Sequence, residues 1–288
     1  MPDRSRPILR SALLGFAGAL LAFAAPAGAQ SVLHYASSAE PRTLDSIVNW
    51  LSVTHQHSYL VYDNLYTLDS NFRPQPQMIE SAVKGADGTS WTLTLRPGQT
   101  FHDGAPVTSA DVIASIKRWA ARDTAGRKLV ELGMQLEEVD ARSFRVKLSV
   151  DTPLLFEAFA KPTATGLFIM RASDAATDPM RAVEHVVGSG PFRFVREAYR
   201  PGDRLVYERN IAYRPRAEPA DYFSGGKVVK VDRVEWLVLP DSATAIASLR
   251  TGELDIYETP PLDLLPVLER NRDIVVEVHG KFGQIGFL

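Results

Sequence analysis

Two short serine- and glycine-containing patterns have the residue types of catalytic or nucleotide-binding loops. Ser189 lies in a Gly-Ser-Gly sequence, but Val187 and Pro191 occupy the positions where a nucleophile elbow needs glycine. The segment 224–227, Ser-Gly-Gly-Lys, lacks the first glycine of a phosphate-binding loop and the hydroxyl residue that follows its lysine. Neither pattern therefore predicts an enzyme.

The histidines are the other residues whose chemistry needs a test. His55 and His57 are close in sequence, but in a helix residues two apart point about 200° apart and cannot share an ion. They would converge in an extended segment, so a metal site stays open as an alternative to solvent-facing helical histidines, which we favour. His102 beside Asp103 is either an acid–base pair or, as we favour, a turn histidine. We predict no catalytic residue, no metal site and no cofactor.

The composition narrows the class of protein. Of the 288 residues 45% are apolar and 23% charged, as in globular proteins, and a formal charge of −2 gives no basic excess for nucleic acid. The sequence has no cysteine, which excludes disulfides, thiolate metal sites, cysteine nucleophiles and a lipid anchor on a cysteine thiol.

The first thirty residues have the three parts of a secretory signal peptide. Arg4, Arg6 and Arg10 make a basic start, residues 12–25 are uncharged and mostly apolar, and small residues follow up to Ala29. The apolar run is shorter than the roughly 20 residues that span a bilayer. We predict cleavage after Ala29, and a mature chain that is exported to the periplasm and not embedded in the membrane.

Hydrophobic periodicity predicts strands that alternate with helices, an α/β or α+β organisation. The predicted strands are residues 32–36, 91–96, 143–148, 192–195, 204–208, 231–239, 254–256 and 274–278. The predicted helices are residues 52–68, 108–121, 151–160, 242–252 and 262–270.

Local signals set the ends and faces of two predicted helices. Thr108 precedes Asp111 by three residues, which predicts a capping box, and Ser242 is expected to cap the helix that Gly252 ends. In helix 108–121 the spacing turns one set of residues inward and another outward. The inward set is Val112, Ile113, Ile116, Trp119 and Ala120, and the outward set is Lys117, Arg118 and Arg122.

Six segments in order resemble one family. Residues 85–112 closely resemble the signature stretch of family 5 extracellular solute-binding proteins, the peptide- and nickel-type receptors of bacterial ABC importers. The further matching segments are residues 40–45, 62–68, 188–192, 208–213 and 249–255. Most of these residues have structural explanations, such as turns and helix caps, and identify the fold more than the ligand.

The resemblance implies a two-lobed, periplasmic-binding-protein-like (type II) α/β clamp with an extra domain inserted in the first lobe. Residues 1–29 are then the signal peptide, 30–62 and 187–288 belong to lobe I, and 63–186 form the inserted domain. Relatives continue for about another domain. We therefore expect this chain to be truncated, with most of lobe II missing and ligand binding weakened or lost.

The resemblance also implies the function: a ligand, a peptide or similar small solute, enters between the lobes, and the closed form docks on a membrane permease. Trp50 and Tyr257 would stack on or hydrogen-bond the ligand, Glu258 would accept an ammonium and Lys281 would meet a carboxylate. The full set of expected cleft residues is Asn49, Trp50, Ser52, Tyr257, Glu258, Lys281 and Phe282. The alternative is a secreted hydrolase or carbohydrate-binding domain.

Overall fold

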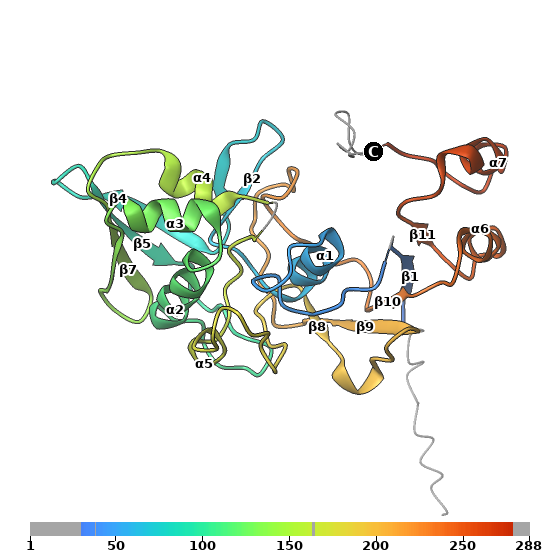
Figure 1. Cartoon of the computed structure of the whole chain (residues 1–288), viewed down its shortest axis with the longest axis horizontal. Coiled ribbons are helices and arrows are strands. Elements are labelled where there is room, and N and C mark those ends of the chain that lie inside the picture. The colour runs from blue at the N-terminus through green and yellow to red at the C-terminus, as the bar shows by residue number, and fades with distance from the viewer. Residues whose placement is uncertain (1–29, 38, 163–164, 279–288) are drawn as a thin grey trace, which may run out of the picture.

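Two larger β-sheets, each with its own helices, and one two-stranded sheet organise the described residues in the computed structural model (Figure 1). The structure describes residues 30–37, 39–162 and 165–278. The predicted signal peptide, residues 1–29, and the predicted cleft residues Lys281 and Phe282 lie outside the described residues.

The first sheet joins residues from both ends of the described chain. Its strands, in spatial order, are β11 (Ile256–Tyr257), β1 (Val32–Ala36), β10 (Arg233–Leu237), β9 (Arg204–Arg209) and β8 (Phe192–Phe194). Strand β1 runs parallel to β10 and β11, whereas β9 runs antiparallel to β10 and β8. Helix α1 (Ser52–Val61) packs on one face of this sheet, and α6 (Ser242–Thr251) contacts β11.

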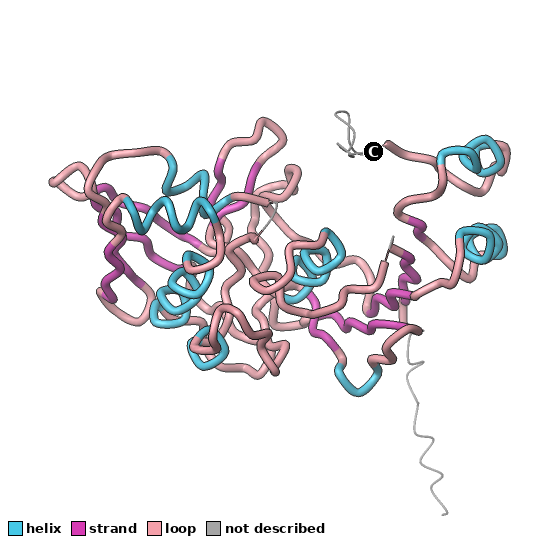
Figure 2. Tube along the Cα trace, in the orientation of Figure 1, coloured by secondary structure: helices cyan, strands magenta, loops and turns pink. Residues whose placement is uncertain are grey.

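The second sheet is antiparallel throughout and is built from the middle of the chain. Its strands, in spatial order, are β4 (Ile79–Lys84), β5 (Ser90–Leu95), β7 (Ser143–Lys147) and β6 (Gln135–Glu138). Figure 2 shows the helices that lie around it. The remaining elements are α2 (Ser109–Ala120), α3 (Thr124–Glu131), α4 (Leu154–Ala160), α5 (Ala172–Ala175), α7 (Leu265–Glu269), β2 (Tyr66–Leu68), β3 (Pro74–Pro76), η1 (Arg196–Ala198) and η2 (Leu262–Leu264).

Most predicted strands and helices form within a few residues of their expected places, and three expectations about where elements form, end or are capped are wrong. The helix from Ser52 ends at Val61, because the chain then turns into strand β2. Residues 274–278 form no strand; they pair with no other strand among the described residues, and Val275 is 80% exposed. The cap of α6 is Asp241, whose side chain accepts a hydrogen bond from the Thr244 backbone, while Ser242 is the first helical residue.

The predicted faces of helix α2 are mostly confirmed. Val112, Ile116 and Trp119 are fully buried, and the Thr108–Asp111 capping box forms. Arg118, expected to point outward, is buried instead: its guanidinium lies 2.8 Å from the Asp45 carboxylate. A buried cation needs such a partner, and helical periodicity alone does not reveal one supplied by a distant loop.

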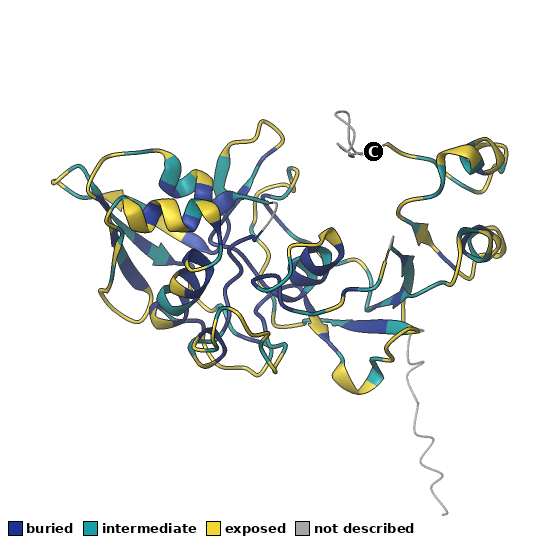
Figure 3. Ribbon diagram, viewed as in Figure 1, coloured by how far each residue is buried: buried dark blue, intermediate teal, exposed yellow. Residues whose placement is uncertain are grey.

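One continuous apolar core connects the two sheets. It includes Trp119 and Phe144 beside the second sheet and Leu205 and Trp236 in the first. Figure 3 shows that α1 is largely buried, whereas α6 and α7 at the far end are largely exposed. Helix α1 lies in the middle of the molecule, between the first sheet and the second (Figure 1).

Candidate functional site

The carboxyl ends of three parallel strands meet at one edge of the first sheet. Strands β1, β10 and β11 end at Ala36, Leu237 and Tyr257. In open α/β sheets, ligands bind just beyond the carboxyl ends of the strands. Tyr257 and Glu258, two of the predicted cleft residues, lie at this edge, which is therefore the candidate site.

Glu258 is held at this edge by its backbone and by helix α1. Its backbone N–H donates to the Ala36 carbonyl at 3.0 Å, and the Gln56 side-chain amide donates to its carboxylate. The Tyr35 hydroxyl donates to the Gln56 side-chain oxygen at 3.4 Å. Burial, followed by the nearby Glu258 carboxylate, raises the pKa of Tyr35, so this phenol keeps its proton and stays a hydrogen-bond donor.

Tyr257 points to the opposite side of the sheet. Successive side chains of a strand alternate between faces, so Glu258 lies toward α1 and Tyr257 toward α6. The Tyr257 hydroxyl accordingly donates to the Ser242 hydroxyl at 3.2 Å. Tyr257 is half-buried, and this contact directs its hydroxyl at α6.

The loop before α1 carries the other predicted cleft residues. Asn49 closes a local turn, since its side-chain oxygen accepts from the Leu51 backbone N–H at 2.9 Å. Trp50 is 72% exposed, and Ser52 opens α1 on the same face as Gln56, one turn later. The structure thus brings the Ser52 face of α1 to Glu258, but among the described residues no hydrogen bond or ring contact joins Trp50 to Tyr257.

Sequence reasoning missed Tyr35 and Gln56 as members of this site. Gln56 lies four residues after Ser52, a spacing that places both on one helix face. Tyr35 is the next-to-last residue of the first strand, beside the edge where it ends. Both signals were present in the sequence, but the pairing of β1 with β11 was needed to connect them to Glu258.

The expectation that His55 and His57 face solvent is wrong, because α1 is enclosed on two sides. His57 packs on Phe194 and its Nδ1 lies 2.9 Å from the Tyr207 hydroxyl, while His55 faces Phe168. Burial lowers the pKa of His57 to about 3 and that of His55 to about 4, so both are neutral at pH 7. Among the described residues, no group of three or more His, Cys, Asp or Glu side chains is arranged to hold a metal ion.

His102 joins three of the signature segments and is not paired with Asp103. Its Nδ1 accepts from the Gly188 N–H at 3.3 Å, so Nε2 carries the proton that it donates to the Gly190 carbonyl at 3.1 Å. The Asn210 side-chain amide donates to the same carbonyl at 3.0 Å. Asp103 instead pairs with Arg171 at 2.9 Å. Burial lowers the pKa of His102 to about 4, and its role here is structural.

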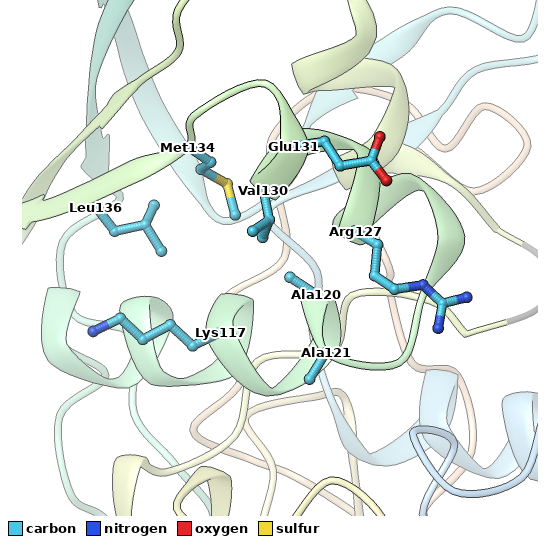
Figure 4. Close-up of a pocket in the computed structure, with 8 residues that line it drawn as sticks. All are labelled: Lys117, Ala120, Ala121, Arg127, Val130, Glu131, Met134 and Leu136. Carbon is cyan, nitrogen blue, oxygen red and sulfur yellow. The ribbon is translucent and has the colours of Figure 1, made fainter.

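Of two grooves in the described part of the chain, the first borders this site and shares Tyr35 and Gln56 with it, and the second lies beside the second sheet. One, of about 760 Å³, runs along the α1 face of the first sheet and is lined by Tyr35, Gln56, Phe223 and Trp236, among others. The second, of about 550 Å³, lies between α2, α3 and β6. Figure 4 shows Val130, Met134 and Leu136 of this second groove opposite Lys117. None of the predicted cleft residues lines either groove.

No helix in the described part of the chain is long and apolar enough to cross a membrane.

Comparisons of the sequence connect the chain to transport proteins. Residues 73–288 match the family described as bacterial extracellular solute-binding proteins, family 5 middle. A probable peptide ABC transporter periplasmic-binding protein of Sinorhizobium fredii is 38% identical over 241 residues, 83% of this chain and 45% of its own. A glutathione-binding protein of Pectobacterium atrosepticum is 29% identical over 73% of this chain and 38% of its own.

Solved structures show the same relationship at the level of the fold. The binding protein AgaA of A. tumefaciens R10, in complex with agropinic acid, is 25% identical with a TM-score of 0.64, over 84% of this chain and 46% of its own. A dipeptide-binding protein of Pseudoalteromonas sp. SM9913, in complex with Met-Leu, is 19% identical with a TM-score of 0.67. The match covers 84% of this chain and 50% of its own.

These matches confirm the predicted mixed α/β fold of periplasmic-binding-protein type, and the chain spans about half the length of the relatives it matches. The resemblance read from six sequence segments is confirmed as well: the chain belongs to family 5 of the bacterial extracellular solute-binding proteins.

Proposed function

We propose that this chain is the substrate-binding component of an ABC importer, which takes a peptide or similar small solute and delivers it to a membrane permease. The observation that carries the proposal is the 38% identity, over 83% of the chain, to a relative named as a peptide ABC transporter periplasmic-binding protein. The carboxyl edge of the first sheet, where such folds bind ligands, supports it.

In this proposal residues 30–62 and 187–288 make up lobe I and residues 63–186 the inserted domain. The first sheet, drawn from residues 32–36 and 192–257, and the second, drawn from residues 79–147, support these boundaries. The ligand closes the clamp because it binds the closed state more tightly than the open one. The proposed cleft residues are Asn49, Trp50, Ser52, Tyr257, Glu258, Lys281 and Phe282.

Thermal-shift and calorimetric titration of the purified chain test this function. The panel holds the ligands of the relatives, Met-Leu, glutathione and agropinic acid, and a set of sugars that tests the alternative. Weak but saturable stabilisation by one of the relatives' ligands, with the ligand recovered intact by mass spectrometry, is the expected result. Hydrolysis of a panel member would favour the alternative of a secreted hydrolase, and binding of sugars alone would favour a carbohydrate-binding domain.

We further propose that the protein is not an enzyme, that it is exported to the periplasm, and that the signal peptide is cleaved after Ala29. The basic, apolar and small-residue segments of residues 1–29 support the signal. With no cysteine in the sequence, the mature protein would diffuse freely without an acyl anchor. Amino-terminal sequencing of the protein from a periplasmic extract is expected to begin at Gln30, and an uncleaved Met1 would contradict this.

A further inference from the structure

The serine of the Gly-Ser-Gly sequence is buried without a hydrogen-bond partner. Ser189 is 5% exposed, and among the described residues no group donates to its Oγ atom or accepts from it. Its neighbours bring the chain close to another backbone, since a Cβ atom at Gly188 or Gly190 would lie 2.0 or 2.7 Å from the Val61 carbonyl oxygen. Burying a hydroxyl without a hydrogen bond is unfavourable, so this atom needs an explanation.

A small cavity lies beside this hydroxyl. Its volume is about 10 Å³, and a cavity needs about that much space to hold one water molecule. Asp63, Gln99, Ser189 and Tyr213 line it, one from each of four segments that resemble the family. Residues from distant parts of the sequence therefore meet around a space of the size of one water.

The charges around the cavity indicate a neutral occupant. The buried Asp63 carboxylate already accepts from the Lys227 ammonium at 2.7 Å and from the Tyr213 hydroxyl at 3.1 Å. The two arginines of the cavity wall, Arg96 and Arg214, are half-buried and exposed, so solvent screens their charges. Neither a cation nor an anion would meet an unpaired buried charge here.

The lining groups have hydrogen-bonding capacity left. The Gln99 side-chain nitrogen donates to the Met78 and Arg96 carbonyls, both at 3.0 Å, which leaves its side-chain oxygen as an acceptor. In the described part of the chain Asp63 Oδ2 accepts from the Tyr213 hydroxyl alone, and a carboxylate oxygen can accept two hydrogen bonds. The Ser189 hydroxyl both donates and accepts. A water molecule, which does the same and makes about three hydrogen bonds when buried, matches this set.

We propose that this cavity binds one structural water, held by the Ser189 hydroxyl and by the free acceptors of Asp63 and Gln99. Asp63 and Gln99 belong to residues 63–186 and Ser189 to residues 187–288, so the water links the two parts of the chain that the proposed domain boundaries separate. The serine that does not fit a nucleophile elbow thus has a role as a water ligand. This inference is independent of the solute that the protein transports.

A crystal structure of the full chain, at a resolution that shows ordered waters, tests the site directly. We expect one water within hydrogen-bond distance of Ser189 Oγ and of an acceptor from residues 63–186. The absence of density in the cavity would overturn the inference, and so would density with the short contacts of a bound metal ion.

Ser189→Ala tests the same site in solution by urea unfolding. The substitution removes one oxygen and keeps the Cβ atom, so the chain is expected to fold. If the hydroxyl binds water, its removal takes one partner from that water, and the urea midpoint falls. If the hydroxyl has no partner, its removal relieves an unfavourable burial, and the midpoint stays or rises.

Ser224→Ala is the matched control for this substitution. Ser224 is also buried in a loop, but its hydroxyl has a protein partner, because it donates to the Asp221 carbonyl at 2.8 Å. We expect Ser189→Ala to lower the urea midpoint by a shift of similar size to that of Ser224→Ala. A Ser189→Ala midpoint at or above that of the unsubstituted chain, while Ser224→Ala lowers it, would overturn the inference.

Discussion

At the scale of single residues, the Asp45–Arg118 pair is the contact whose loss should cost most. The two side chains are 2% and 1% exposed, and Asp45 also accepts hydrogen bonds from the Ile47 and Val183 backbones. Asp45→Ala would leave a buried guanidinium without its counterion, so we expect a loss of about 3–5 kcal/mol in the free energy of unfolding. Urea denaturation monitored by circular dichroism measures it.

The control for this prediction is an ion pair of similar length at the surface. Arg145 lies 2.8 Å from Glu137, and both side chains are well exposed. Because water screens such a pair, Glu137→Ala should cost less than about 1 kcal/mol. Equal effects of the two substitutions would contradict the importance of burial at Asp45.

Gly188 is required because a neighbouring backbone leaves no space for a side chain. A Cβ atom at this position would lie 2.0 Å from the Val61 carbonyl oxygen. Gly188→Ala must therefore push apart the end of α1 and the segment before β8, and we expect a loss of about 1–3 kcal/mol in the free energy of unfolding. Thermal unfolding tests this against Gly88→Asn, since Gly88 has positive φ and open space, which asparagine tolerates.

At the scale of elements, the amino-terminal cap of helix α6 can be tested by substitution. The Asp241 carboxylate accepts the Thr244 N–H at 2.8 Å, and its pKa is lowered chiefly by that backbone hydrogen bond. Asp241→Ala should lower the melting temperature by about 2–4 °C, because the first turn of α6 loses this acceptor. Ser242→Ala should lower the melting temperature less. If Ser242→Ala lowered it more than Asp241→Ala does, Ser242 would be the cap.

Helix α1 shows where periodicity misleads. Its apolar residues continue past Val61 into strand β2, so the pattern alone extends the helix to Leu68. The same helix buries His55 and His57 because sheet residues cover one side and Phe168 the other. Enclosure from two sides depends on segments more than a hundred residues away in sequence.

At the scale of the whole molecule, three histidines, two of them buried and His102 half-buried, make stability depend on pH. In the folded protein the pKa of His57 is about 3 and those of His55 and His102 about 4, against an ordinary value of 6.5. The unfolded chain binds these protons below about pH 6.5 and the folded chain does not. Stability is therefore complete above pH 6.5 and falls as the pH drops toward 4, by about 1.4 kcal/mol per pH unit for each histidine.

Urea unfolding at pH 7.5, 6.0 and 5.0 measures this dependence. Glutamine cannot be protonated in this range. In His57→Gln the free energy of unfolding should therefore fall less steeply below pH 6.5, by the contribution of one histidine, than in the unsubstituted chain. His34→Gln is the control, since the His34 side chain, in the middle of β1, is 36% exposed. A flat stability profile between pH 5 and 7.5 would contradict the burial of these neutral imidazoles.

The sequence by itself determined the family, the alternation of strands and helices, and most element positions. The family follows from the six segments that resemble it, whereas the elements follow from local signals: periodicity, caps, and glycines where the backbone turns. It also placed Glu258 and Ser52 among the cleft residues, although their membership of a ligand cleft remains a proposal.

Only the tertiary structure decided which of these residues meet. The parallel pairing of β1 with β11 places Glu258 beside Gln56 and Tyr35, and the alternation of side chains sends Tyr257 to α6. Likewise, the burial of His57 and Arg118 depends on partners from other elements. The physical reason is that pairing and burial join residues far apart in the chain, whereas periodicity and caps report only on neighbours.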